Sequence, residues 1–153
     1  MKITERKKRP RIIGWREYVS LPELGLSDLN VKIDTGARTS ALHAHVINIS
    51  EIDGVEMVEF NLLDSDGEPS SHHIFPVYDF RAIKNTSGIA EQRYVILTKM
   101  VIGTKRWTID VALSDRAAMK HDMILGRKAI RRRNIVVDPG RSYLQGKPQV
   151  GGQ

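Results

Sequence analysis

The chain has 153 residues, of which 41% are hydrophobic, so it can bury the core of one globular domain and is too short for a second full domain. It contains no cysteine, which excludes disulfides, thiolate metal ligands and a cysteine nucleophile. The formal net charge is +6, but residues 1–11 hold six basic residues and one acidic residue, so the remaining residues carry a net charge of only +1. This distribution predicts weak, salt-dependent contact with polyanions through a basic tail rather than sequence-specific nucleic-acid recognition.

The two ends of the chain are expected to be tails around one domain. We expect a flexible basic tail over residues 1–11, a domain over 12–146 and a flexible C-terminal tail over 147–153. No apolar run after the basic start is long enough for a signal peptide or a membrane span, so we expect a soluble cytoplasmic protein.

Most of the chain has the sequence pattern of β-strands separated by turns. β-rich segments occur at 15–21, 30–34, 42–52, 55–63, 71–80, 93–102 and 105–114. Asp53-Gly54 and Gly103-Thr104 are spaced for tight hairpins. Only two short segments, 115–122 and 126–133, look helical, and the basic 126–133 run is expected to be a solvated helix face. Frequent strands with short connections predict an all-β, mainly antiparallel barrel or sandwich.

An aspartate and a glycine interrupt the apolar pattern of residues 31–42, at Asp34-Thr35-Gly36. These three residues could simply form a turn that closes a strand. However, the apolar residues on both sides would hold the Asp34 carboxylate near the core, which costs several kcal/mol unless it is hydrogen-bonded or shares a proton with a second acid. Two carboxylates in contact provide one protonated and one charged group, an acid and a base at a single site.

Two motifs in this order resemble those of retropepsin-type aspartic proteases. Asp34-Thr35-Gly36-Ala37 is similar to their active-site triplet, and Leu125-Gly126-Arg127 is similar to the segment that passes beneath the catalytic loop and opens a short helix. The resemblance implies a closed barrel of the acid-protease fold. It also implies that Asp34, Thr35 and Gly36 are catalytic, with Thr35 bracing the loop and Gly36 admitting the substrate backbone. Leu125, Gly126 and Arg127 would support the site.

A narrower family resembles the chain over residues 12–146. The segments "KIDTGARTSALHA", "RYVI", "MILGRKAI" and "VVDPGRSYL" are similar to a bacterial retropepsin-like family whose members carry the label ATP-dependent zinc protease and are often encoded beside ribosomal-protein glutamate ligases. The chain has no Gly-x-x-x-x-Gly-Lys-Ser/Thr phosphate loop and no His-Glu-x-x-His pair, so we expect no cofactor. The resemblance implies an aspartic peptidase.

One catalytic triplet per chain predicts a homodimer. Asp66-Gly67 lies in a polar turn and Asp138 is followed by proline, so neither resembles a second triplet. The expected active site therefore pairs Asp34 with its symmetry mate. The flap that covers a bound peptide is expected at residues 79–93, with Thr86, Ser87 and Gly88 at its tip. These three residues, with Ala37 and Arg38, are the expected substrate-binding residues.

Arg38 departs from the viral retropepsins, which carry an acidic residue there to pair with the arginine of the Gly-Arg motif. Arg38 and Arg127 both stay charged and need anionic partners. Asp110, Asp115 or Asp122 could neutralise them inside the domain. Alternatively, Arg38 faces the cleft and binds acidic side chains or a C-terminal carboxylate, which would suit an acidic or polyglutamylated peptide.

Two alternatives to an aspartic peptidase remain open. A zinc peptidase could use His43 and His45, two residues apart on a strand, with His72, His73 or His121 completing the site. No general base is marked for such a site, and partly exposed strand histidines need no metal. A non-catalytic dimerisation or peptide-binding module could also keep this fold.

Overall fold

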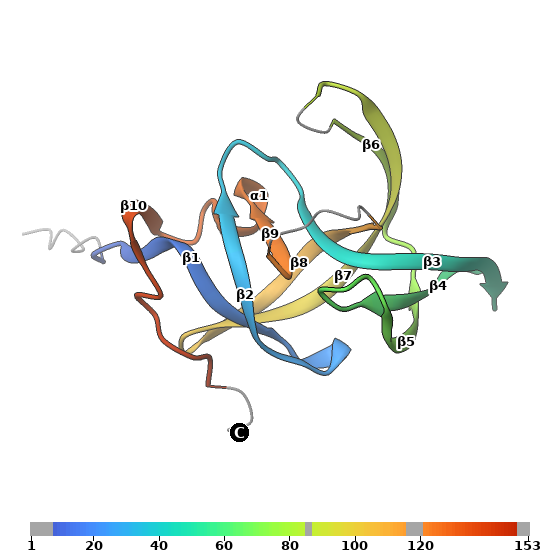
Figure 1. Cartoon of the computed structure of the whole chain (residues 1–153), viewed down its shortest axis with the longest axis horizontal. Helices are drawn as coiled ribbons and strands as arrows, with labels where there is room; N and C mark the ends of the chain where they lie inside the picture. The colour runs from blue at the N-terminus through green and yellow to red at the C-terminus, as the bar shows by residue number, and fades with distance from the viewer. Residues whose placement is uncertain (1–7, 85–86, 116–120, 150–153) are drawn as a thin grey trace, which may run out of the picture.

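The computed structural model describes residues 8–84, 87–115 and 121–149 of the chain (Figure 1). Strands dominate it. In chain order the elements are β1 (Arg11–Leu21), the 3-10 helix η1 (Pro22–Leu24), β2 (Leu26–Asp34), β3 (Ser40–Ile52), β4 (Val55–Leu63), β5 (Pro69–Pro76), β6 (Asp79–Lys84), β7 (Ala90–Ile102), β8 (Lys105–Ser114), β9 (Met123–Gly126), α1 (Arg127–Ile130) and β10 (Ile135–Ser142).

Six strands form a closed barrel. β1, β2, β9, β3, β8 and β7 are hydrogen-bonded in that order, and the pairing of Ser20 in β1 with Val101 in β7 closes the ring. Among the described strands, seven of the ten pairings are antiparallel, and β1–β10, β2–β9 and β3–β8 are parallel. The predicted closed, mainly antiparallel barrel is confirmed.

Alternating apolar residues fill the barrel. The fully buried side chains include Ile13, Val31, Ile96, Val111 and Leu125, each from a different strand of the barrel. Burying a side chain of this size contributes roughly 1.5–3 kcal/mol to the free energy of folding. The core therefore fixes the strands that precede and follow Asp34-Thr35-Gly36 in the chain.

Two predicted hairpins are present, and one of them extends the barrel. Asp53 and Gly54 both have positive φ angles, 51° and 80°, the left-handed conformation that a two-residue hairpin turn requires. Gly103, with a φ of 56°, turns β7 into β8. The first half of β3 lies in the barrel, and its second half pairs with β4, which pairs with β5. This three-stranded extension projects to the right in Figure 1.

Several boundaries differ from the sequence-based predictions. The segment 71–80 contains the end of β5 and the start of β6, and β9 and β10 were not expected as strands. The helix expected at 126–133 covers only Arg127–Ile130. Most of the helix expected at 115–122 lies outside the described residues, and its described ends are not helical.

Hydrogen bonds hold the C-terminal segment against the barrel. The fully buried carboxylate of Glu17 accepts hydrogen bonds from the backbone N–H groups of Gly14 (2.6 Å), Leu144 (2.9 Å) and Gln145 (3.1 Å), which satisfy its charge. The N–H of Gln149 donates to the carbonyl of Gly103 at 2.9 Å. The outer parts of the two expected tails, residues 1–7 and 150–153, lie outside the described residues. Within the described part of the chain, no helix combines the length and apolar character needed to cross a membrane.

Candidate active site

The fold brings the two motifs side by side although they are almost a hundred residues apart in sequence. Asp34 is the last residue of β2, and it is in register with Gly126, the last residue of the parallel strand β9. β9 also pairs with the start of β3 through Ala41 and Leu42. The segment between β2 and β3, residues 35–39, therefore arches over the end of β9; we call it the catalytic loop (Figure 1).

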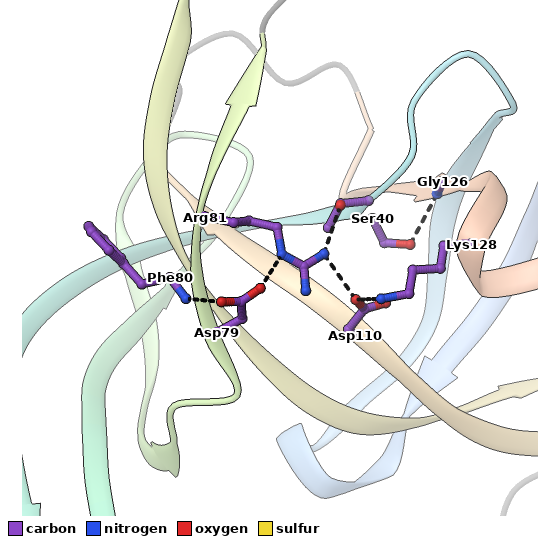
Figure 2. Close-up of polar contacts among 8 residues, drawn as sticks. Ser40, Asp79, Phe80, Arg81, Asp110, Gly126 and Lys128 are labelled. Atoms are coloured by element: carbon purple, nitrogen blue, oxygen red, sulfur yellow. Dashed lines mark hydrogen bonds and ion pairs between the residues drawn. The ribbon is translucent and has the colours of Figure 1, made fainter.

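The catalytic loop rests directly on Gly126. A Cβ atom at this position would lie 2.7 Å from the backbone carbonyl carbon of Thr39 and 2.8 Å from the carbonyl oxygen of Arg38, distances that real Cβ atoms do not tolerate. The N–H of Gly126 donates to the Ser40 hydroxyl at 3.0 Å (Figure 2). Leu125, the preceding residue, is fully buried beneath it.

Arg127 holds the loop from the other side. Its N–H donates to the carbonyl of Ala37 at 2.8 Å, and its guanidinium donates to the carbonyls of Gly36 at 3.1 Å and Thr35 at 3.4 Å. Within the loop, an Asp34 carboxylate oxygen accepts from the N–H of Gly36 at 3.1 Å. The predicted supporting and catalytic residues thus meet in one cluster, while their catalytic roles remain predictions.

One chain alone leaves the Asp34 carboxylate half-buried, with Thr35 and Gly36 exposed beside it. In the described residues the Thr35 hydroxyl forms no hydrogen bond, so the loop is braced within one chain by Arg127 rather than by Thr35. The apolar flanks place Asp34 at the edge of the core, next to buried Ile33, and not inside it. The surface that carries the triplet is therefore open to a second molecule.

Arg38 is exposed, and the three aspartates that could have neutralised it have other partners. Asp110 binds Arg81 and Lys128, Asp115 lies near His45 and Arg93, and Asp122 accepts from the backbone N–H of Asn30. Among the described residues, neither Arg38 nor Arg127 forms an ion pair with a carboxylate.

A partly buried ion network, which we call the Asp110 network, joins the flap to the catalytic loop (Figure 2). The Asp110 side chain, only 7% exposed, is 2.8 Å from the Lys128 ammonium and 3.2 Å from the Arg81 guanidinium. Arg81 also binds Asp79 at 2.8 Å and the Thr39 hydroxyl at 3.2 Å. The one sequence signal was Asp110 itself, a carboxylate between the apolar residues of a core strand.

The ionisation of this network follows from its contacts. Burial raises the pKa of Asp110, but the hydrogen bond and charge of Lys128 and the charge of Arg81 outweigh burial and leave that pKa below its ordinary value. The hydrogen bond from Arg81 is the main cause that lowers the pKa of the exposed Asp79 carboxyl. Both carboxylates therefore stay charged at neutral pH.

A surface pocket of about 560 Å³ lies beside the catalytic loop. It is lined by Arg38, Tyr78, Asp79, Arg81, Ala82 and Lys128. Arg81 and Lys128 are already paired with Asp79 and Asp110, which leaves Arg38 as the cation in this lining without a described anionic partner. We call this the Arg38 pocket.

The expected flap is a β-hairpin. β6 pairs with the first residues of β7, from Asp79 opposite Val95 to Lys84 opposite Ala90. Ser87 and Gly88 are exposed at its tip, and Gly88 has a φ of 80°, while Thr86 lies outside the described residues. Figure 1 shows this hairpin rising at the same end of the molecule as the catalytic loop.

The histidines considered for zinc do not converge. His43 is buried, whereas the His45 side chain is 59% exposed and lies 3.6 Å from Asp115. His72 binds Glu59 and His73 contacts the Ser71 hydroxyl. Burial, followed by the charge of His72, lowers the pKa of His73. Over residues 8–84, 87–115 and 121–149, no three His, Asp or Glu side chains are grouped to hold a metal ion.

A closed barrel that carries an Asp-Thr-Gly loop above a Gly-Arg turn defines the class of retropepsin-like proteins. Residues 12–148 match the model of the RimB-like family, described as retropepsin-like aspartic endopeptidase RimB, and the chain belongs to this family. The resemblance drawn from the motifs is confirmed.

Other relatives, found by sequence and by structure, carry different descriptions. The chain is 39% identical over 140 residues to a probable alpha-L-glutamate ligase of Parasynechococcus marenigrum, covering 90% of this chain and 30% of that protein. It is 41% identical over 131 residues to another of Desulfotalea psychrophila, covering 84% and 28%. The chain thus spans about 30% of the length of the curated relatives it matches. A crystal structure of a Legionella pneumophila protein of unknown function aligns with a TM-score of 0.73 and 28% identity, over 88% of this chain and 98% of that one.

Proposed function

We propose that the protein is an aspartic endopeptidase that works as a homodimer. The observation that carries the proposal is the position of Asp34. Its carboxylate stands half-exposed at the end of β2, next to the catalytic loop that Gly126 and Arg127 contact, on a surface where a second chain could supply the second acid. Two-fold symmetry would then bring the two Asp34 side chains face to face.

In this dimer the two Asp34 carboxyls share one proton. The ionised carboxylate takes a proton from a water molecule held between them, and the protonated partner donates a hydrogen bond to the scissile carbonyl. The water oxygen attacks the carbonyl carbon, and the proton then passes to the leaving amine. The substrate would lie extended beneath the flap, where backbone hydrogen bonds provide affinity and alternate side chains provide specificity.

We propose acidic or polyglutamylated peptides as the substrate class. Arg38 is an exposed guanidinium at the catalytic loop that has no described internal carboxylate, and it can bind a carboxylate with two parallel hydrogen bonds. In the relatives named probable alpha-L-glutamate ligase, the segment that is homologous to this chain is about 30% of a longer polypeptide. A peptidase that cleaves at glutamate residues would act on bonds to the same amino acid that the name of those relatives gives for the ligase.

The first prediction tests the catalytic dyad. Asp34→Asn should lower peptide hydrolysis by at least about 100-fold, because an amide cannot act as the general base. Turnover of a peptide library, followed by mass spectrometry, measures this loss. Asp66→Asn, an exposed turn residue, is the matched control and should leave activity unchanged. Activity should persist in chelator; if chelation stops turnover and zinc restores it, a metal mechanism replaces this one.

The second prediction tests the substrate class. Wild type should cleave a Glu-rich peptide in preference to its Gln-rich counterpart, and Arg38→Ala should reduce kcat/KM for the Glu-rich peptide by about tenfold, since a charged hydrogen bond contributes roughly 1.5–3 kcal/mol. Arg106→Ala removes an exposed arginine at the Gly103 hairpin and should have no effect. Equal cleavage of both peptides by wild type would mean that Arg38 has no role in substrate choice.

A further inference from the structure

Three exposed arginines follow the short helix α1. Arg131, Arg132 and Arg133 come directly after Ile130, and Arg132 has a φ of 64°, an unfavourable backbone conformation for a residue with a side chain. Such a conformation persists only where neighbouring contacts impose it, and these residues are enriched at functional positions. Here the N–H of Arg131 donates to the backbone carbonyl of Arg127 at 2.9 Å, and the Arg133 guanidinium lies 5.0 Å from the centre of the Trp107 ring. The turn is therefore fixed with its charges outward.

The N-terminal basic segment joins the same surface. The Asn134 side chain donates to the carbonyls of Lys8 at 3.1 Å and Arg9 at 3.3 Å, and the N–H of Arg11 donates to the carbonyl of Asn134 at 2.9 Å. Lys8 and Arg9 are exposed. Two basic stretches more than a hundred residues apart in sequence thus converge. We call Lys8, Arg9 and Arg131–Arg133 the basic flank. Within the described chain, none of its side chains is paired with a carboxylate.

The basic flank is continuous with the active-site region. A pocket of about 360 Å³ is lined by Trp107, Thr108 and the three arginines of the flank, and also by Tyr78 and Lys128. Tyr78 and Lys128 line the Arg38 pocket as well. A chain that leaves the Arg38 pocket past these two residues therefore reaches the flank.

We infer that the basic flank is an exosite for the acidic part of a polypeptide substrate that lies outside the catalytic cleft. This inference rests on the proposed peptidase function. Each exposed guanidinium contributes little to affinity alone, but several together attract a chain of carboxylates, speed its association and lose their effect as salt rises. Continuity with the Arg38 pocket favours a polypeptide over nucleic acid, and one face of the Trp107 ring is already occupied by the Arg133 guanidinium, which competes with a base for stacking on that face.

Binding can be separated from catalysis in the full-length Asp34→Asn chain. Fluorescence anisotropy should show that a labelled 12-residue Glu-rich peptide binds at least about tenfold more tightly than a 4-residue Glu peptide, which occupies only the Arg38 pocket, at low salt. Arg131→Gln/Arg132→Gln, which leaves Arg133 on Trp107 and preserves the turn's anchor, should remove this advantage without changing affinity for the short peptide. Lys105→Gln/Arg106→Gln is the control with the same charge change at the Gly103 hairpin.

The outcomes distinguish the exosite from the peptidase. In the chain that retains Asp34, the flank variant should raise KM for the long peptide and leave kcat unchanged. Failure of wild type to cleave either peptide, with binding still dependent on Arg131 and Arg132, overturns the peptidase function and the exosite role with it, and leaves the basic flank as a binding surface for acidic polypeptides. Unchanged affinity of the flank variant for the long peptide overturns the exosite. Tighter binding of a single-stranded RNA than of the long peptide, lost in the same variant, also overturns it in favour of a nucleic-acid surface.

Discussion

At the scale of single residues, the absence of a side chain at Gly126 determines how closely the catalytic loop packs on the end of β9. The loop backbone at Arg38 and Thr39 occupies the space that any Cβ atom would need, and backbone atoms, unlike the end of a flexible side chain, cannot move aside independently. Asp34, the last residue of β2, leads directly into this loop. In the proposed dimer, the position of its carboxylate relative to the symmetry mate would therefore depend on a residue that has no reactive group.

The third prediction follows from this contact. Gly126→Ala should lower the free energy of unfolding by about 1–3 kcal/mol, because overpacking forces the backbone to shift, and it should reduce any peptidase activity more than tenfold because the dyad geometry changes. Urea denaturation and peptide turnover measure the two effects. Gly140→Ala is the control, since a Cβ there would meet only the Asp138 carboxylate at 3.5 Å. A Gly126→Ala protein as stable and active as the Gly140→Ala protein would refute this account.

Some of these residues were predictable from sequence, and others were not. Asp34-Thr35-Gly36 and Gly126-Arg127 form a pattern in which each residue type has a steric or chemical reason. The sequence did not predict that Arg38 has no carboxylate partner in the described chain. This depends on Asp110 pairing with Arg81 and Lys128, and those pairs form only because β6, α1 and β8 pack together. Arg81 and Lys128 are ordinary surface residues in sequence and gave no signal.

At the scale of elements, the Asp110 network joins parts that share few other contacts. Arg81 comes from the flap strand β6, Asp110 from the barrel strand β8 and Lys128 from α1, and Thr39 adds the catalytic loop. The base of the flap is therefore tied to the same unit that supports Asp34. The exposed tip at Gly88 lies outside this network.

The fourth prediction is a pH-dependent loss of stability in Asp110→Asn. Removing the carboxylate leaves the Lys128 ammonium without its described carboxylate partner and Arg81 with Asp79 alone, which should cost about 1–3 kcal/mol at neutral pH. The pKa of Asp110 in the folded protein lies below its ordinary value of 3.8. The stabilisation is therefore complete above that value and is lost as pH falls through the lower folded-state pKa, so wild type and variant should converge in the acid range.

Thermal unfolding across pH 3 to 7 tests this prediction, with Asp79→Asn as the control. Asp79 shares the Arg81 partner, but its side chain is 46% exposed against 7% for Asp110, so its loss should matter much less. A constant difference between wild type and Asp110→Asn at every pH would show that the charge of Asp110 is not what stabilises the network.

The strand pattern predicted from sequence was most reliable where neighbouring strands are joined by short turns. Segments 55–63 and 105–114 coincide with β4 and β8. β9 was missed because four residues are too few to show a period, and β10 because Pro139 and Gly140 interrupt its pattern. Both pair in parallel with distant strands, and local periodicity carries no information about such partners.

At the scale of the whole molecule, one chain supplies half of the proposed chemistry. The described chain has one Asp-Thr-Gly loop, and its exposed Thr35 and Gly36 form part of a surface that the proposed dimer would cover. Activity should therefore depend on association, and the dyad should be a property of the pair.

The fifth prediction uses mixed dimers. When wild type is co-refolded with an equal amount of Asp34→Asn, random pairing gives about one quarter of dimers with two Asp34 residues, so activity per wild-type subunit should fall by about half. Specific activity should also decrease on dilution, with a parallel loss of dimer in sedimentation measurements. Activity that is proportional to wild-type chain alone, at every mixing ratio and dilution, would contradict a shared site.

The buried Glu17 carboxylate, which accepts hydrogen bonds from the C-terminal segment, affects how this domain can be joined to others. By holding Leu144 and Gln145 against β1, it directs the following residues toward Gly103, and Figure 1 shows the red end of the described chain on the side of the barrel opposite the catalytic loop and the flap. A linker that leaves the domain from this point does not pass over the catalytic loop or the flap. In a relative whose additional polypeptide follows the matching region, which is about 30% of its length, that polypeptide would leave from the side of the barrel opposite the catalytic loop.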